Sequence, residues 1–264
     1  MNDLQLHIIH SKRQPIGSDW DDANVCSSYW RLYINNRDGA SLRLTRSVYP
    51  LPAGHIHLIP AYVRFSCVNT TPVDHYYIHF DLLGLTPLLQ KSLFVEPLSM
   101  PLTHTSHQVL SCHKRGQTTA DSPELLFLTQ TLVLESLAHA FAGLTPGKRT
   151  QLIAAFAVPS PVQPAIRLLE QILPAAPCVA DLADACSMSE DHFIRRFRQA
   201  VGQTPARYVL QRRLALAARQ LLYTTDSIET IATRHQFSNR FHFTRAFSRE
   251  MGIPPAAYRS ATRV

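Results

Sequence analysis

The side chains with the clearest capacity for chemistry lie in one short stretch near the C-terminal end of the chain. Arginine, asparagine and threonine recur there on one face of an expected helix: Asn239, Arg240, Thr244, Arg245 and Arg249. Arginine presents parallel N–H donors that match the acceptor pair of guanine or a phosphate. Asparagine and threonine bond base edges in the same groove. The stretch therefore indicates recognition by hydrogen bonding.

These side chains need a frame, and residues 227–259 predict a short helix, a tight turn and a second helix. Asp226 or Ser227 can cap the first helix, and Glu229 follows Asp226 at the spacing of a capping box. Ser238 can cap the second helix. Each helix carries an apolar stripe at helical spacing, Ile228, Ile231 and Ala232 in the first and Phe243, Ala246 and Phe247 in the second. Gly252 fits a left-handed C-terminal cap. This is a helix-turn-helix unit.

The same unit occurs a second time, about fifty residues earlier. Six residues recur fifty positions later: Phe193, Arg195, Phe197, Gly202, Pro205 and Tyr208 as Phe243, Arg245, Phe247, Gly252, Pro255 and Tyr258. Across the first helix and the turn the offset is forty-nine, so one extra residue falls between Ser189 and Phe193 or their counterparts. Two aromatic residues, a glycine, a proline and a tyrosine in register indicate an internal repeat.

The repeated motif resembles the AraC/XylS family of bacterial transcription regulators. The resemblance rests on Ile231-Ala232, Phe237-Ser238, Phe243-x-Arg245-x-Phe247, Gly252, Pro255 and Tyr258-Arg259, and on the first-unit residues from Leu182 to Pro205. It covers about residues 163–262. One departure is Gln236, where the family usually has glycine. A left-handed turn residue then falls on Gln236 or moves by one position, at a cost of about 1 kcal/mol.

The resemblance implies a partner and a set of contact residues. Two recognition helices would enter successive major grooves of double-stranded DNA, ~34 Å apart. Base and phosphate contacts would come from Asp191, Ile194, Arg195 and Arg198 in the first unit, and from Asn239, Arg240, Thr244, Arg245 and Arg249 in the second. The family also implies a small-molecule effector, a homodimer and, for an activator, RNA polymerase as a partner. Activation is the usual role in the family.

Charge and cysteine usage agree with a DNA partner. Residues 161–264 hold fourteen Arg, no Lys and eight Asp or Glu, so a net charge of +6 of the whole chain's +7 lies on the repeated segment. Five scattered cysteines without Cys-x-x-Cys spacing fit a reducing cytoplasm. We find no signal pattern and no apolar run near the ~20 residues of a membrane span, and expect no membrane partner.

Residues 1–121 predict a β domain. Short runs rich in β-branched and aromatic residues are separated by turn signals: Leu4–Ile9, Trp30–Ile34, Ser41–Arg46, His55–Ile59, Val63–Val68 and His75–Phe80. Such spacing favours a sandwich or barrel. The segments Pro52-x-Gly54 and His75–Phe80 resemble the cupin-like barrel that AraC-type regulators often carry, which would be the ligand sensor.

Ten of the thirteen histidines lie before residue 160, which raises the question of a metal. His55 and His57 share a strand face, as do His75 and His79, but neither pair has a nearby carboxylate. A metal site needs three or four converging ligands, so we predict no metal and no cofactor. We expect instead a pocket for a small polar molecule such as a sugar, with four contributing side chains: Trp30, Arg43, His57 and Tyr77.

Helical periodicity begins at Ser122, and the segment 122–158 is expected to pack on the barrel and to mediate dimerisation. Ser122 can cap a helix that Pro123 begins, with stripes of Leu125, Leu128 and Leu132 and of Leu126, Val133 and Leu137. A second helix is expected over Lys148–Val158. A proline-rich linker, residues 159–164, then leads to the DNA-binding domain, residues 165–264. Within that domain, a long helix from Pro205 should join the two repeated units.

The sequence thus predicts an α+β protein: an N-terminal cupin-like β-barrel with dimerisation helices, and a C-terminal all-α domain with two helix-turn-helix units. The expected function is sequence-specific, ligand-responsive DNA binding by a transcription regulator, with no enzymatic activity. The alternative is a cupin-type metal-binding enzyme or metal sensor fused to a DNA-binding domain. Stoichiometric metal in the purified protein would distinguish that alternative.

Overall fold

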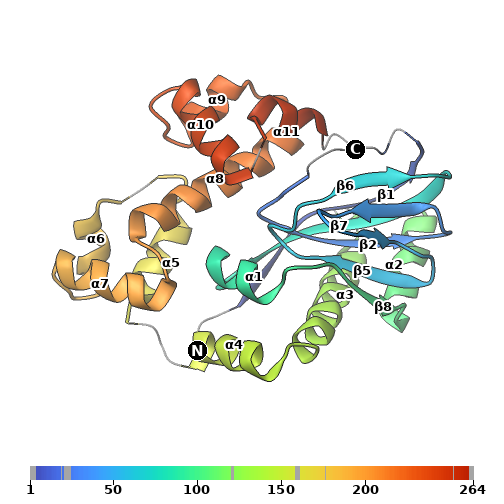
Figure 1. Ribbon diagram of the computed structural model, residues 1–264, viewed down its shortest axis with the longest axis horizontal. Coiled ribbons are helices and arrows are strands. Elements are labelled where there is room, and N and C mark those ends of the chain that lie inside the picture. The colour runs from blue at the N-terminus through green and yellow to red at the C-terminus, as the bar shows by residue number, and fades with distance from the viewer. Residues whose placement is uncertain are drawn as a thin grey trace. The chain divides into compact units, whose positions relative to one another are not determined.

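The computed structural model describes residues 4–18, 20, 25–119, 122–157, 161–175, 177–251 and 253–261. The chain divides into two compact units (Figure 1). The β unit comprises Leu4–Leu83 and Gln90–Thr150, and the helical unit comprises Gly84–Leu89 and the chain from Gln151 onward. The α+β class is confirmed, because antiparallel sheets fill the first part of the chain and helices fill the last.

The β unit contains two antiparallel sheets. The larger has the order β1 (Gln5–Ile16), β7 (Val73–Leu83), β2 (Trp30–Asn35), β5 (His55–Ile59), β8 (Leu98–Pro101), and the smaller has β4 (Val48–Pro50), β3 (Ala40–Arg43), β6 (Ser66–Asn69). All six expected strands exist. The sequence reading missed β4 and β8, which are short edge strands that end at a proline and so carry little alternating pattern. In the longest pairing, Gln5 opposes Leu83 and Ile16 opposes Val73.

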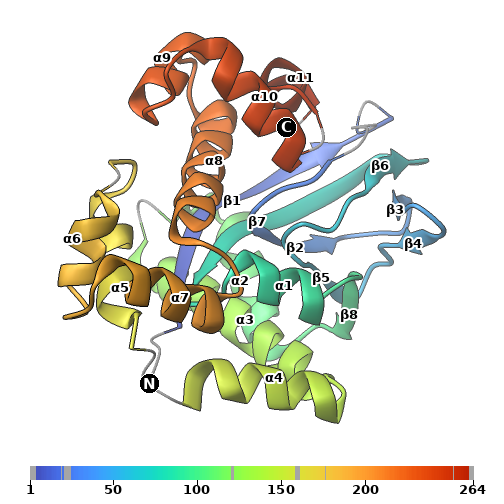
Figure 2. The same cartoon turned by 60° about the vertical axis from the view of Figure 1, so that its left-hand side comes forward.

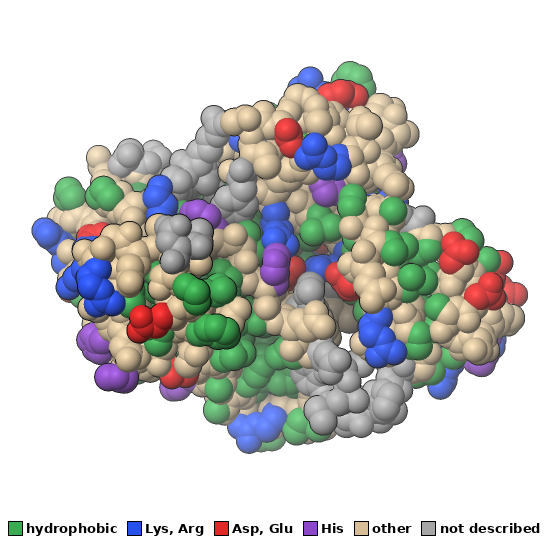
Figure 3. All heavy atoms as spheres, turned by 180° about the vertical axis from the view of Figure 1, so that it is seen from behind, with side chains coloured by type: hydrophobic (Ala, Val, Ile, Leu, Met, Phe, Trp, Pro, Cys, Tyr) green, Lys and Arg blue, Asp and Glu red, His purple; other side chains and the backbone are tan. Residues whose placement is uncertain are grey.

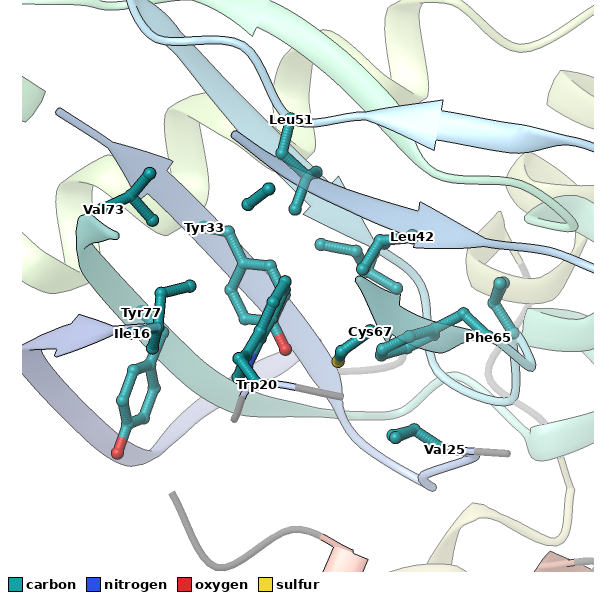
Figure 4. Close-up of a cluster of buried hydrophobic side chains, with 13 residues drawn as sticks. Ile16, Trp20, Val25, Tyr33, Leu42, Leu51, Phe65, Cys67, Val73 and Tyr77 are labelled. Atoms are coloured by element: carbon teal, nitrogen blue, oxygen red, sulfur yellow. The ribbon is translucent and has the colours of Figure 1, made fainter. Parts of the chain in front are cut away.

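The core of the β unit lies between the two sheets (Figure 4). Tyr33 and Tyr77 come from the larger sheet, Leu42 and Cys67 from the smaller one, and Trp20 packs against Tyr33. Each of these side chains is at least nine-tenths buried. Removing a large apolar side chain from water contributes about 1.5–3 kcal/mol, so this layer supplies much of the stability of the unit.

Two helices cover the other face of the larger sheet, α2 (His104–Lys114) and α3 (Pro123–Ala142) (Figures 1 and 2). The expected start of α3 is confirmed, because Ser122 Oγ accepts a hydrogen bond from Leu125 N at 3.2 Å. The expected two stripes form one buried face that includes Leu125, Leu132, Val133 and Leu137. The next helix, α4 (Pro146–Ala157), begins two residues before the expected Lys148.

The α3 helix also corrects the expectation that no segment is long and apolar enough for a membrane span. It has 20 residues, with a mean hydropathy of 1.4 over its most apolar window. Its packing explains that composition: seven of its side chains are buried, and Thr103 and Thr105 at the start of α2 donate hydrogen bonds to its Glu135. The buried apolar residues of α3 therefore serve packing within the β unit.

The helical unit contains seven further helices, α5 (Gln163–Ile172), α6 (Val179–Asp184), α7 (Glu190–Val201), α8 (Pro205–Tyr223), α9 (Ile228–Arg234), α10 (Arg240–Met251) and α11 (Pro255–Ala261). They form two cores, with Phe193 and Phe197 in one and Phe243 and Phe247 in the other. The long helix α8 runs from one to the other (Figure 2). It gives Tyr208 and Val209 to the first core, and Leu214, Ala217, Ala218 and Leu221 to the second.

The expected linker, residues 159–164, falls partly outside the described residues, since 159 and 160 are not among them. Its last two residues do not belong to a linker. Gln163 and Pro164 form the first turn of α5, with Val162 as the N-cap. A proline is tolerated there because the N–H groups of the first turn have no partner within the helix.

Candidate nucleic-acid interface

Both helix-turn-helix turns contain a non-glycine residue in the left-handed region. Ser187 has φ 53° in the first turn, and Gln236 has φ 57° in the second. Of the two expected alternatives for the second turn, the left-handed residue falls on Gln236 and does not move by one position. The same backbone bond follows each turn: Met188 N donates to Ala183 O, and Phe237 N donates to Ala232 O, both at 2.9 Å. The two units therefore share their turn geometry.

The caps of the second unit differ in part from expectation. Ser227 caps α9 by accepting a hydrogen bond from Thr230 N at 3.0 Å, whereas Asp226 instead accepts from Gln220 and Arg234. The cap of α10 is Asn239, not Ser238, because Asn239 Oδ1 accepts from His242 N at 2.8 Å. Since Ser189 is the cap of α7, the extra residue of the second unit lies in its turn, just before the cap.

The inward faces of α7 and α10 are aromatic, as expected. The rings of Phe193 and Phe197 lie 5.5 Å apart, and those of Phe243 and Phe247 lie 5.4 Å apart. All four side chains are fully buried. Gly202 ends α7 with φ 77° and donates its N–H to Arg198 O at 2.9 Å. The expected counterpart, Gly252, lies outside the described residues.

The outward face of α10 presents the expected cations. Arg240, Arg245 and Arg249 are exposed, and Thr244 is half-buried beside them. Asn239 is also exposed, but its carbonyl oxygen is occupied by the cap, which leaves the amide group as its contact for a partner. The first turn of α10 contains no acidic residue. This face is therefore electrostatically suited to a nucleic acid.

Sequence reasoning missed Phe241, which is 78% exposed on α10. A large apolar side chain in that setting loses nothing by contacting a partner and can pack against a thymine methyl or a sugar. The signal was present in the sequence, because Phe241 precedes the core residue Phe243 by two positions and so falls on the opposite face.

The first recognition helix places its four expected residues together. Asp191, Ile194, Arg195 and Arg198 line one surface hollow of about 450 Å³, together with Gln199 and Thr204. Unlike α10, α7 begins with two acidic residues, Glu190 and Asp191. A carboxylate repels phosphate, so the start of α7 is electrostatically less suited to a nucleic acid than the start of α10.

Two carboxylates, one buried and one half-buried, fasten the units to the connecting helix α8. Glu250, at the end of α10, accepts from Arg207 at 2.7 Å and from Gln211 at 2.9 Å, and its side chain is only 4% exposed. Glu170 of α5 accepts from Arg212 and from the hydroxyl of Tyr208. Charge-assisted hydrogen bonds of this kind contribute about 1.5–3 kcal/mol each. Helices α5 and α10 are thereby held against α8.

Of the four residues expected in a ligand pocket of the β unit, two share one face of the larger sheet and two lie elsewhere. Tyr77 and His57 face the space between the sheets, where each lies opposite Tyr33 across a strand pair. Trp30 lies on the other face of β2, in contact with Phe80 and Phe94, and donates its indole N–H to Gln90 at 2.8 Å. Arg43 is exposed at the end of β3. Trp30 therefore serves the packing of the sheet rather than a pocket.

The inner histidines are neutral core residues. Burial lowers the pKa of His57 to about 4 and that of His75 to about 3, and it holds the pKa of His79 well below its usual range. His57 donates from Nε2 to Pro52 O, and His75 Nδ1 lies 2.7 Å from Asn35 Oδ1. Within the described part of the chain, His, Cys, Asp and Glu form no group of three that could hold a metal ion.

A different hollow of the β unit gathers cations. It has a volume of about 320 Å³ and lies between the β3–β4 turn, the β5–β6 loop and the segment after α1 (Pro87–Leu93). Arg46, Arg64 and Lys91 line it, with Glu96 as its acidic member. Lys91 Nζ lies 4.4 Å from the ring centre of Tyr62, which has φ 67°. Sequence reasoning missed this site because its residues come from three segments that are far apart in the chain: two loops, and the end of α1 with the residues after it.

Comparison with known proteins bears on the helical unit. A family model described as a helix-turn-helix domain matches residues 182–261. The uncharacterized HTH-type transcriptional regulator YbfP of Bacillus subtilis is 40% identical over 99 residues, which are 38% of this chain and 34% of YbfP. A putative AraC-like transcription regulator of Streptomyces lividans is 32% identical over 128 residues, 48% of this chain and 39% of that protein. The chain spans only about a third of the length of these relatives.

A solved structure extends the likeness to the whole fold. ToxT from Vibrio cholerae superimposes with a TM-score of 0.55 over 98% of this chain and all of that chain, at 13% identity. At this identity the likeness concerns the fold alone, an N-terminal β region followed by a helical domain with two helix-turn-helix units. The relatives named are regulators, not enzymes.

Proposed function

We propose that this chain, which belongs to the AraC/XylS family of transcription regulators, binds specific sites on double-stranded DNA through α7 and α10. Each helix would enter one of two successive major grooves, ~34 Å apart. Arg240, Arg245 and Thr244 would read bases from α10, and Arg195 and Ile194 from α7. Arg198 and Arg249 would contact phosphates.

The observation that supports this proposal most strongly is the pairing of a shared frame with exposed donors. Both units have the same turn, the same aromatic core and an outward arginine two residues after the first core phenylalanine. Arg195 and Arg245 are both exposed. A repeated frame that presents the same cation at the same position on two helices suits a ligand that itself repeats, as the grooves of DNA do.

Selection of duplexes from a random pool by the full chain tests the proposal. The expected product is a site with two conserved blocks about one helical turn apart, bound more tightly than random DNA by about a thousandfold or more. Binding of all pool members with one affinity would contradict it.

We propose that the protein is a homodimer whose interface is the exposed side of α3. Phe127 is 67% and Leu134 is 52% exposed there, and with Thr131 and Ala138 they recur every three or four residues along one stripe. Figure 3 shows apolar side chains gathered over this helix. An exposed apolar stripe of this kind marks a contact surface. The buried Leu132, part of an expected stripe, belongs to the core instead.

Sedimentation of the double variant Phe127→Glu with Leu134→Glu tests the dimer. Two added charges on the stripe should give monomers while the sheet content in circular dichroism is retained. Val48→Glu is the matched control, because Val48 is 61% exposed on β4 and away from the stripe. An unchanged dimer in the double variant, or a monomeric wild type, would remove α3 from this role.

We propose that a small effector carrying a carboxylate or phosphate binds the hollow lined by Arg46, Arg64 and Lys91. The sequence predicts a small polar ligand such as a sugar, and the three cations support an acidic ligand more than a neutral one. Thermal shift with citrate, inorganic phosphate and neutral sugars tests this. A ligand at 100 times its dissociation constant adds ~2.7 kcal/mol of stability. Arg64→Gln should abolish the shift, and a shift with sugars alone would contradict the proposal.

The effector would regulate DNA binding from the β unit, with recruitment of RNA polymerase if the protein activates transcription. A fragment of residues 163–264 is then expected to bind the selected duplex and to lose any response to effector. A fragment that still responds would place the sensor in the helical unit.

A further inference from the structure

One side chain of the connecting helix contacts both helix-turn-helix units. Arg213 lies in the middle of α8. Its Nε donates a hydrogen bond to Pro174 O at 3.0 Å, just after α5 of the first unit. Its Nη2 donates to Gln236 Oε1 at 3.0 Å, in the turn of the second unit. A guanidinium can hold two such partners at once because its donors are fixed in one plane.

The acceptor of this bridge is the residue that departs from the usual glycine of the turn. Gln236 has φ 57°, a conformation that glycine adopts without cost and that a side chain opposes by about 1 kcal/mol. Glycine at this position would offer no side-chain acceptor to Arg213. The strain of Gln236 is thus accompanied by a contact that the unstrained residue could not make.

The bridge differs from the other polar contacts of α8. Glu170 joins α5 to α8, and Glu250 joins α10 to α8, so each of these carboxylates fastens one unit to the connector. Both carboxylates bond side chains of α8, so each reaches the other unit only through that helix. Arg213 differs because it bonds Pro174 and Gln236 at once. One side chain thereby links the end of α5 to the turn before α10.

We propose that the Pro174–Arg213–Gln236 bridge fixes the separation and rotation of α7 relative to α10, and so selects DNA by the spacing of its two half-sites. The inference rests on the proposed function, in which both helices read one duplex. One inserted base pair moves the second half-site by about 3.4 Å and turns it by about a tenth of a helical turn. If the two units are held rigidly, the inserted base pair weakens binding. If they move freely, both helices still reach their half-sites and the affinity changes little.

Gln236→Met tests the inference, because methionine keeps the length of the side chain and the strain of the left-handed backbone but removes the acceptor. Gln236→Glu keeps the acceptor and should behave as wild type. Ser187→Ala is the matched control, since Ser187 occupies the same left-handed position in the first unit. Arg213→Met removes the bridge from its other side while keeping the aliphatic stem that packs on α8.

The measurement is the ratio of dissociation constants for two duplexes. One is the sequence selected from a random pool by the full chain, and the other has one base pair inserted between its half-sites. The wild-type protein should prefer the first. Gln236→Met and Arg213→Met should each reduce the ratio of the two dissociation constants by about threefold to tenfold. This is the change in binding that the loss of one hydrogen bond produces. Gln236→Glu and Ser187→Ala should leave it unchanged.

A wild-type ratio in both Gln236→Met and Arg213→Met would overturn the inference. So would an equal loss of affinity for both duplexes, because the bridge would then serve only the folding of the unit. Failure of the pool to give any specific duplex is a different result, since it would remove the proposed function and this inference with it.

Discussion

The two helix-turn-helix units of this protein have the same frame and different surfaces. Each has a turn residue at φ near 55°, a T-shaped or tilted pair of buried phenylalanines and an outward arginine between them. Yet α7 starts with Glu190 and Asp191, and α10 starts with Arg240 and Phe241. The frame is constrained by packing, whereas the outward residues are free to follow the partner. We infer that the buried residues shared by the two units determine stability, and that the outward residues in which they differ determine specificity for a partner.

The differences extend to the interior. His235 in the second unit occupies the place of Cys186 in the first, at the offset of forty-nine. His235 is buried and its Nε2 lies 2.9 Å from Gln220 Oε1, and burial lowers its pKa to about 4. Cys186 is half-buried, and burial raises the pKa of its thiol. The second unit thus has a histidine that titrates in acid at this position, and the first unit has a thiol that does not.

The largest effect is expected from the shared core. Phe197→Ala and Phe247→Ala should each cost about 3–5 kcal/mol in free energy of unfolding, because each removes a fully buried ring. Urea denaturation of the two variants measures these costs. Costs that differ by more than about 2 kcal/mol between the two variants would contradict the equivalence of the two frames.

The next largest effect is a loss of stability in mild acid, which is expected from the second helix-turn-helix unit. Below pH 6.5 the unfolded chain protonates His235 while the folded state, with a pKa of about 4, does not. Stability is therefore lost as the pH falls through this window, by about 1.4 kcal/mol per pH unit and up to about 3 kcal/mol. In His235→Gln, urea titrations between pH 7 and pH 4 should show a correspondingly weaker pH dependence. Cys186→Ser is the matched control and should keep the wild-type slope.

The smallest effect concerns the phosphate contact proposed for Arg249. Arg249 corresponds to Gln199 in the first unit. Arg249→Ala should weaken binding to all sequences alike and reduce the slope of log affinity against log salt by about one. Gln199→Ala should leave the slope unchanged. Filter binding or fluorescence anisotropy across a salt series measures both, and a sequence-selective loss in Arg249→Ala would reassign the residue to base reading.

Most of the helical unit could be predicted because its signals are local. The repeat, the aromatic spacing and Ser227 as a cap each depend on residues a few positions apart, and all agree with the structure. The left-handed turn residue was predicted to within one position for the same reason, and it falls on Gln236. The α10 cap was misplaced by one residue because Ser238 and Asn239 are both good caps, and only the length of the turn decides between them.

The β unit was harder because its signals are long-range. Strand β2 is buried on both faces, so its sequence does not alternate and does not show whether the face of Trp30 or that of Tyr33 lies between the sheets. The cationic hollow draws on two loops and on the end of α1 with the residues after it. The Arg213 bridge joins Arg213 to Pro174, 39 positions earlier, and to Gln236, 23 positions later. Such pairings follow from packing, which a single sequence does not reveal.

The most direct test compares Arg245→Ala with Arg195→Ala on the selected duplex and on random DNA. We expect Arg245→Ala to lose about 1–3 kcal/mol on the selected duplex, to relax preference at one base pair and to change little on random DNA. Arg195→Ala should show the same pattern in the other half-site with a smaller loss, because Asp191 weakens the contact of α7 with DNA. Equal losses on selected and random DNA for Arg245→Ala would make it a backbone contact and contradict the assignment of α10 as the principal reader.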